Sequence, residues 1–248
     1  MVEAIKELRK ICQRQDYNPS LRSRILRFFS IYLTKLLLYT SITANQVDYI
    51  RIILSVFAGI FFAFNQYWFN ILAVFFMQIS FFMDSNDGEI ARYRKTQGPN
   101  GLFVDTLTHD FLIPLAFIGI SIANPSMLPF GFSALLFFLL YHDLKKTKEE
   151  MVFVMLNYRL REEGKIEIIN SEPKCDEVQK NSFIRKILKR VLPIFNVEPA
   201  LYLISFAAIF NFLNLVILFY GTALPLIWII FAYRHIKIGV KPYRHFLK

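Results

Sequence analysis

Residues 67–92 read YWFNILAVFFMQISFFMDSNDGEIAR, an apolar run that continues without a break into a cluster of acidic residues. Further apolar runs lie at 47–64 and 101–123, and 55% of the chain is hydrophobic, with 27 Phe. A helix needs about 20 apolar residues to cross the hydrocarbon core of a bilayer. Helices are favoured over open sheets there, because backbone polar groups in lipid must find partners within the segment. The sequence therefore predicts an all-α integral membrane protein.

The hydropathy pattern divides the chain into six expected transmembrane helices and the segments that join them. These helices are expected at 47–64, 67–83, 101–123 and 127–141, and as two short spans within 197–232. Residues 41–238 thus form one six-helix transmembrane domain, with a cytoplasmic connection at about 145–195. Residues 1–40 form a cytoplasmic N-terminus with an interfacial amphipathic helix, and 239–248 form a basic cytoplasmic tail.

The expected interfacial helix lies at 21–38. Its basic residues are Arg22, Arg24, Arg27 and Lys35, and its apolar residues recur at helical spacing: Ile25, Phe28, Phe29, Tyr32 and Leu36. A helix with one basic and one apolar face lies in the membrane interface rather than crossing the bilayer. Packing of this helix against the transmembrane domain is an alternative, and the two arrangements are compatible.

The distribution of basic residues predicts the orientation of the chain. The net charge is +10, and Lys and Arg lie before the first span, between the second and third, between the fourth and fifth, and after the sixth. Basic residues are retained on the cytoplasmic side of a membrane. Both termini and the acidic cluster are therefore expected to face the cytoplasm.

Composition also limits the classes of partner and of covalent link. Basic residues attract anionic lipid and polyanionic nucleotides. They are not interleaved with aromatic residues on a polar domain, so nucleic acid is not an expected partner. Cys12 and Cys175 are isolated thiols, which provide neither a disulfide framework nor a cysteine metal site. Membrane lipid is the expected partner, and a second copy of the chain, in a homodimer, is another.

The acidic residues have the spacing of a site. Side chains three or four apart share a helix face, which pairs Asp84 with Asp87, and Asp105 with His109. Ionisable residues at membrane depth are rare and usually functional. Converging carboxylates repel one another unless a divalent cation, a proton or a basic side chain relieves them, and Arg92 supplies a planar fork suited to phosphate. The pattern predicts phosphate chemistry at a metal site; structural acids paired with neighbouring basic residues are the alternative.

The motif that contains these residues resembles that of the CDP-alcohol phosphotransferases, which is D-x2-D-G-x2-A-R, a spacer, and G-x3-D-x3-D. The matching residues are Asp84, Asp87, Gly88, Ala91, Arg92, Gly101 and Asp105, and His109 replaces the fourth Asp. Residues 43–51, TANQVDYIR, resemble a second family segment, T-P-N-x-[LI]-T-x-x-R, with Ala44 in place of Pro and Asp48 in place of Thr. Asp48 and Arg51 lie three apart and can pair on one helix face.

The resemblance implies an activity: transfer of a phosphoalcohol group, expected to be phosphatidyl, from a CDP-alcohol to an acceptor hydroxyl, with release of CMP. By resemblance, Asp84, Asp87 and Asp105 hold Mg²⁺ or Mn²⁺ on the diphosphate of the donor. The nucleotide-binding residues that the resemblance implies are Asn45, Gly88, Ala91, Arg92 and Gly101. The donor is expected to be linked to a lipid, in phospholipid or related phosphoglycoconjugate synthesis, and the acceptor alcohol stays open.

His109 is the expected catalytic base, and Asp110 is its rival. In the family, the acid at this position is thought to accept the proton of the attacking hydroxyl. An imidazole, with an unperturbed pKa of about 6.5, can do so near neutral pH. Asp110 follows Asp105 by five residues, about 140° round a helix, so it is expected to point away from the site unless Pro114 distorts the helix.

Two other classes of membrane protein use acidic residues at membrane depth. Intramembrane prenyltransferases carry two acidic repeats on separate helix pairs, and the chain after residue 145 has no such repeat. A non-catalytic transport protein that uses the acids as a relay is expected to show inverted repeats, and none is visible. Protection of the protein by CDP or CMP distinguishes the first class from the other two.

Overall fold

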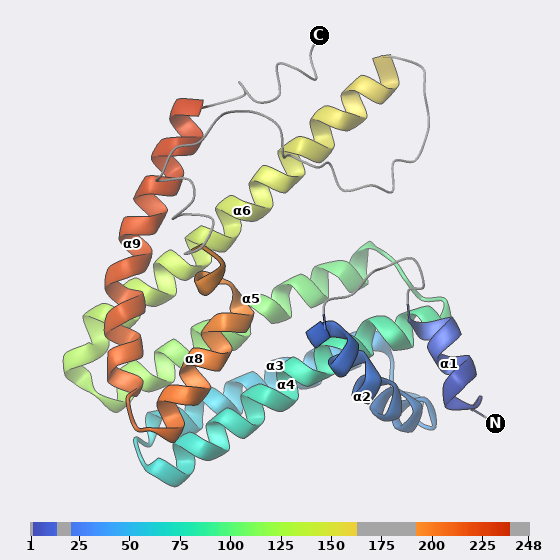
Figure 1. The fold of residues 1–248 in the computed structure, drawn as a ribbon, viewed down its shortest axis with the longest axis horizontal. Helices are drawn as coiled ribbons and strands as arrows, with labels where there is room; N and C mark the ends of the chain where they lie inside the picture. Colours follow the sequence, from blue (N-terminus) through green and yellow to red (C-terminus); the bar gives the residue numbers. More distant parts are fainter. Residues whose placement is uncertain (1, 14–20, 163–191, 239–248) are drawn as a thin grey trace.

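The computed structural model describes residues 2–13, 21–162 and 192–238, which form helices and the turns between them (Figure 1). The short helices are α1 (Ile5–Cys12), η1 (Pro125–Met127), η2 (Leu192–Phe195) and α8 (Val197–Ile209). The long helices are α2 (Leu21–Leu38), α3 (Ala44–Ala63), α4 (Tyr67–Arg94), α5 (Pro99–Ala123), α6 (Leu128–Glu162) and α9 (Leu213–Ile238). No strand occurs in the described ranges, which confirms the all-α class.

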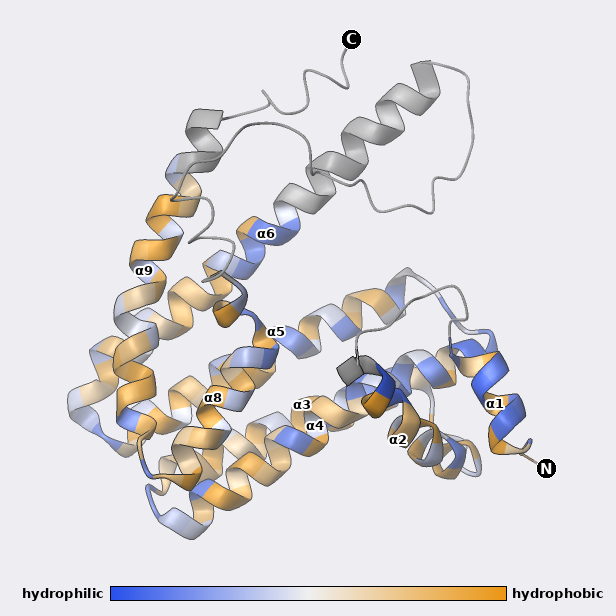
Figure 2. Cartoon of the chain, in the orientation of Figure 1, coloured by the Kyte–Doolittle hydropathy of each residue, from blue (hydrophilic) through white to orange (hydrophobic). Residues whose placement is uncertain are grey.

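In the described part of the chain, 5 helices are long and apolar enough to cross a membrane. They are α3, α4, α5, the first part of α6 and most of α9, and Figure 2 shows apolar residues along them. This agrees with an integral membrane protein. The apolar helix α8 is shorter than these five, so the total of six spans stays a prediction.

Helix α4 extends further than expected. The second span is expected to end at Met83, whereas α4 continues to Arg94. Residues 84–94 contain one Gly and no Pro, so nothing in this stretch strongly opposes a helix. The helix ends at Lys95, whose φ of 56° is left-handed. The first half of the acidic motif therefore lies on one continuous helix.

The last helices also depart from the expected spans. Helix α6 extends to Glu162, past the span expected at 127–141. The expected division of 197–232 into two helices is confirmed, but α8 has 13 residues and α9 has 26, so the second helix is longer than a short span. The chain turns between the two helices at Asn211, where φ is 62°. The apolar residues from Leu213 onward belong to α9.

Helix α3 lies between α4 and α5 and packs against both (Figure 1). The contact with α5 depends on Gly59 and Gly119: a Cβ atom on Gly119 would lie 2.1 Å from the carbonyl oxygen of Gly59. Small residues let the backbones of membrane helices approach this closely. The polar residues near the start of α3 are thereby held between those of α4 and α5.

Helices α1 and α2 pack on the end of α4 that carries the motif (Figure 1). The apolar part of this contact includes Leu8, Cys12, Ile31 and Ile90. Helix α2 also exposes aromatic side chains, among them Phe28, Phe29 and Tyr32. The packing alternative for 21–38 is therefore correct, and the exposed aromatic side chains remain suited to the membrane interface. The short helix α1, half of whose residues are charged, was not expected from the sequence.

Several expectations concern residues outside the described ranges. These are the connection beyond residue 162, the basic tail at 239–248 and the surroundings of Cys175. The domain boundaries that depend on them stay predictions, as does the homodimer.

Candidate active site

Three helices bring ionisable side chains to one place in the bundle. Helix α3 contributes Asp48 and Arg51, α4 contributes Asp84 and Asp87, and α5 contributes Asp105 and His109. The three metal-ligand candidates of the sequence analysis are thus brought together. The expected pairs, three or four residues apart, each occupy one helix face.

Arg51 lies at the centre of this cluster and is buried, with 2% of its surface exposed. Its Nη1 atom donates to Asp48 at 2.6 Å and to Asp105 at 3.1 Å, and lies 3.5 Å from a carboxylate oxygen of Asp87. Its Nη2 atom donates to Asp84. One guanidinium therefore faces four carboxylates. Sequence reasoning found the pairing with Asp48 but not the other three contacts.

His109 and Asp110 point in different directions. The Nε2 atom of His109 lies 3.0 Å from Oδ1 of Asp84 and 3.5 Å from Oδ1 of Asp105. Asp110 instead accepts a hydrogen bond from Nζ of Lys146, on α6, at 2.6 Å. Helix α5 is continuous through Pro114, so the angular separation of about 140° expected for residues five apart is kept. The geometry places His109, and not Asp110, at the acidic cluster.

Among the described residues, two overlapping sets of side chains can hold a metal ion. One consists of Asp84, Asp105 and His109, and the other of Asp48, Asp87 and Asp105; within each set the ligand atoms lie within 4.8 Å of one another. Carboxylate oxygens suit Mg²⁺ and Mn²⁺, and an imidazole favours Mn²⁺ over Mg²⁺. The donor atoms therefore fit the expected ions. Asp48 is an additional candidate ligand that the sequence analysis treated only as a partner of Arg51.

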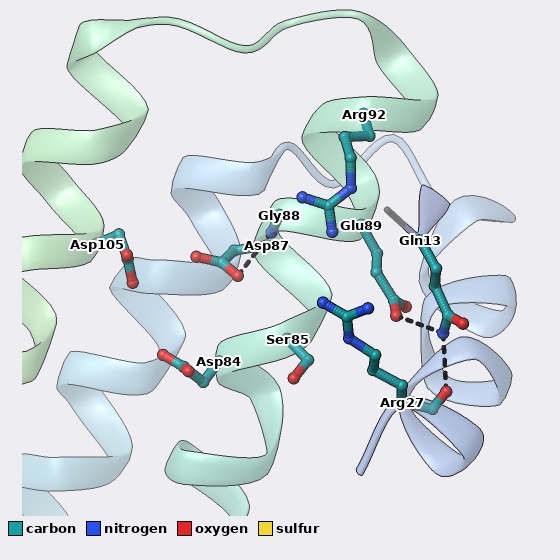
Figure 3. Close-up of a pocket in the computed structure, with 9 residues that line it drawn as sticks. All are labelled: Gln13, Arg27, Asp84, Ser85, Asp87, Gly88, Glu89, Arg92 and Asp105. Atoms are coloured by element: carbon teal, nitrogen blue, oxygen red, sulfur yellow. Dashed lines mark hydrogen bonds between the residues drawn. The ribbon is translucent and has the colours of Figure 1, made fainter. Parts of the chain in front are cut away.

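A cavity of about 210 Å³ opens beside the acidic cluster (Figure 3). Its lining residues come from α2, α4, α5 and the end of α1: Gln13, Arg27, Asp84, Ser85, Asp87, Gly88, Glu89, Arg92 and Asp105. A Cβ atom on Gly88 would lie 3.1 and 3.3 Å from the two terminal nitrogens of Arg92. Arg92 also donates from Nε to the carbonyl oxygen of Cys12. The absence of a side chain at Gly88 therefore leaves room for the Arg92 guanidinium beside the cavity.

The other expected nucleotide-binding residues, Asn45, Ala91 and Gly101, do not line the cavity. Thr43 and Gln46 form a capping box that starts α3 and places Asn45 in its first turn. A Cβ atom on Gly101 would lie 3.7 Å from Oδ1 of Asn45, so the starts of α3 and α5 are close together. Ala91 is three residues after Gly88 on α4 and therefore on a similar face.

Residues 41–161 match the family model for CDP-alcohol phosphatidyltransferase. The chain carries a CDP-alcohol phosphatidyltransferase domain. The match covers α3, α4, α5 and nearly all of α6, and it includes every expected metal, catalytic and nucleotide-binding residue. The family transfers phosphoalcohol groups and depends on divalent metal ions, which agrees with the cluster of Asp48, Asp87 and Asp105. No curated protein shows significant sequence similarity to the chain.

Proposed function

We propose that the protein transfers a phosphoalcohol group, phosphatidyl in our expectation, from a CDP-alcohol to an acceptor hydroxyl and releases CMP. The observation that carries this proposal is the convergence on one cavity of Asp84, Asp87 and Asp105, which all belong to the domain that matches the family. The cavity is small and polar, and it lies among helices apolar enough to span a membrane. A lipid-linked donor can present its diphosphate there while its acyl chains remain in the bilayer.

Asp84, Asp87 and Asp105, together with Asp48, are the residues that would hold Mg²⁺ or Mn²⁺. Such an ion neutralises charge on a diphosphate and on the departing phosphate. Arg51 offsets part of the mutual repulsion of the four carboxylates, and its contacts keep them converged. A single guanidinium leaves the carboxylates in excess, which favours binding of a divalent cation beside them.

His109 is our candidate for the general base. A carboxylate can only accept hydrogen bonds, so the Nε2 atom that lies 3.0 Å from Asp84 carries the hydrogen when the ring is neutral. The Nδ1 atom is then free to accept the proton of the attacking hydroxyl. As that proton leaves, the hydroxyl oxygen bonds to the phosphorus atom of the transferred group, and the bond from phosphorus to CMP breaks.

We also propose that the active site and both termini face the cytoplasm, where soluble CDP and CMP are found. The basic residues on the expected inner side support this orientation. An intramembrane prenyltransferase is disfavoured, because the two sets of metal-ligand candidates in the described residues share Asp105 and form one cluster. Two separate acidic motifs are expected of that class.

The test is release of CMP by purified protein supplied with CDP-diacylglycerol, Mg²⁺ or Mn²⁺, and a panel of acceptors. The panel contains glycerol phosphate, inositol phosphate, serine and choline. We expect at least one acceptor to give CMP in proportion to transferred lipid. Thermal protection by CDP, measured in parallel, separates this function from transport and from prenyl transfer, since neither of those uses a cytidine nucleotide.

A further inference from the structure

The cavity has a basic wall that comes partly from outside the family match. The match begins at residue 41, whereas Arg27 lies on α2 and Gln13 directly follows α1. Figure 3 shows the guanidinium groups of Arg27 and Arg92 and the carboxylate of Glu89 on one side of the cavity, and the carboxylates of Asp84 and Asp105 on the other. The Glu89 carboxylate already accepts hydrogen bonds from Gln13, Ser30 and Thr34, so the two guanidinium groups are the phosphate-binding groups that this side offers to a ligand.

We propose that Arg27 binds a phosphate group of a substrate, so that the N-terminal helix α2 forms part of the substrate site. This inference rests on the proposed function and extends it to a residue outside the family domain. The guanidinium group presents N–H donors in a planar fork that matches the geometry of phosphate oxygens. Arg27 and Arg92 together provide two such forks.

A buried network of hydrogen bonds holds α2 in place beside the motif. Glu89, with 1% of its surface exposed, accepts hydrogen bonds from Ser30 at 2.7 Å, from Thr34 at 2.6 Å and from Gln13 at 2.9 Å. Asn86 donates from Nδ2 to the carbonyl oxygen of Ser30 and to Oγ1 of Thr34, both at 2.8 Å. Glu89 and Asn86 therefore attach the helix that carries Arg27 to the helix that carries the metal-ligand candidates.

The same network fixes the backbone of Arg27 itself. Its carbonyl oxygen accepts a hydrogen bond from Nε2 of Gln13 at 2.8 Å and one from Oγ of Ser30 at 3.4 Å. Gln13 thus bonds both to Arg27 and to Glu89. These contacts hold the backbone of α2 beside the cavity at Arg27, so the Arg27 side chain starts from a fixed position next to the space that it lines.

The size of the cavity indicates which part of a substrate it takes. Pockets for complete small-molecule ligands usually enclose about 300–1,000 Å³. The volume of about 210 Å³ lies below this range but leaves room for a phosphate group. The phosphate can belong to the diphosphate of the donor or to a phosphorylated acceptor, and the chemistry at Arg27 is the same for both.

The test compares Arg27→Gln with Arg24→Gln in the full chain. Arg24 is exposed on the same helix and does not line the cavity, so its replacement removes the same charge elsewhere. Binding of CDP is measured by calorimetry in Mg²⁺. Binding of inorganic phosphate is measured on protein saturated with CDP. We expect Arg27→Gln to weaken one of these by about 10- to 100-fold, the factor that corresponds to a hydrogen bond to a charged group.

The two measurements distinguish the sources of the phosphate. Weaker binding of CDP assigns Arg27 to the donor, and weaker binding of phosphate to the CDP-saturated protein, in which both donor phosphate positions are filled, assigns it to the acceptor. Arg24→Gln is expected to change the affinities for CDP and for phosphate by less than about twofold, because solvent screens a charge on the surface. Arg27→Lys, which keeps the charge but not the planar fork, is expected to lose an intermediate amount and serves as the second variant if Arg27→Gln does not fold.

Unchanged binding of both CDP and phosphate by a folded Arg27 variant overturns the inference and leaves the proposed function intact. If the wild-type protein binds neither CDP nor phosphate, both the inference and the proposed function are overturned. A purely structural role predicts a lower melting temperature without ligand and no change in either affinity, and this result also contradicts the inference.

Discussion

Replacement of Arg51 by Gln removes the one guanidinium that contacts all four carboxylates of the cluster. The side chains of Asp48 and Arg51 are 2% and 3% exposed, so their contact is a buried ion pair. Removal of one partner from such a pair costs about 3–5 kcal/mol, because the other charge stays buried without compensation. Asp84 and Asp105 are 31% and 34% exposed, so solvent screens their contacts and they add little to this figure.

The expected loss can be measured as a melting temperature in detergent. A change of 1 kcal/mol shifts the melting temperature of a chain of this size by roughly 2–4 °C, so Arg51→Gln is expected to melt about 6–20 °C lower in EDTA. Mg²⁺ or Mn²⁺ is expected to recover much of this loss, since a bound cation compensates the same carboxylates. The wild-type protein, which keeps its guanidinium, should gain less from the metal.

The control for this prediction is Arg94→Gln. Arg94 donates to the carbonyl oxygens of Ser41 and Thr40 at 3.0 and 2.8 Å, and both contacts are exposed. Its replacement is expected to cost less than about 1 kcal/mol and to be independent of metal. Two results would show that Arg51 is not the internal counter-ion of the cluster. One is that Arg51→Gln and the wild type have the same melting temperature in EDTA, and the other is that metal raises the melting temperature of both proteins equally.

Three further predictions concern packing, thiol reactivity and catalysis. Gly119→Ala places a methyl group 2.1 Å from the carbonyl oxygen of Gly59, and its unfolding free energy is expected to fall by at least about 2 kcal/mol in denaturant melts. Burial raises the pKa of the Cys12 thiol to about 11, so maleimide should label it slowly at pH 8 and faster as the pH approaches 11. His109→Ala is expected to lower the turnover rate by about 10²- to 10⁴-fold with little change in CDP affinity, and His109→Asp to recover part of it.

Each of these predictions has its own control. Gly98→Ala meets no atom within 4 Å and should cost far less than Gly119→Ala; equal losses would exclude the close contact of α3 and α5 as the cause. Labelling is measured in a Cys175→Ser background, and rapid labelling of folded protein at pH 8 would contradict burial of Cys12. For catalysis, Asp110→Asn should cost far less than His109→Ala, since Asp110 pairs with Lys146; an inactive Asp110→Asn beside an active His109→Ala would reverse their roles.

The pH dependence of turnover gives a second readout on His109. Protonated imidazole cannot accept a proton, so the rate is expected to fall as the pH drops and the ring becomes charged. In His109→Asp the fall should move to lower pH, because a carboxylate stays deprotonated there. A profile identical in the two proteins would exclude residue 109 as the base.

The sequence predicted the helices that depend on local pattern. Apolar runs identified α3, α4 and α5, and the spacing of Asp105 and His109 placed both on one helix face. Helix α1 was not predicted because it has only eight residues and half of them are charged. Helices α4 and α6 continue past the expected membrane spans because the apolar stretch ends before the helix does.

The parts of the site that were missed depend on contacts between distant residues. Gln13 and Glu89 are 76 residues apart in the sequence, and Arg51 and Asp105 are 54 apart. Periodicity describes one helix at a time, so it identified the pair of Asp48 and Arg51 but not the approach of α4 and α5 to it. Glu89 occupies a motif position at which the family pattern specifies no residue, which left no signal in the motif itself.

Metal-dependent release of CMP from CDP-diacylglycerol tests the central claim most directly. Asp105 belongs to both sets of metal-ligand candidates, so Asp105→Asn is the most informative variant beside the wild type. We predict that the wild-type protein forms CMP in Mg²⁺ or Mn²⁺ with at least one acceptor, that EDTA abolishes this, and that folded Asp105→Asn is inactive in either metal. Release of CMP at the full rate in EDTA or by Asp105→Asn, or no release with any acceptor, would contradict the proposed function.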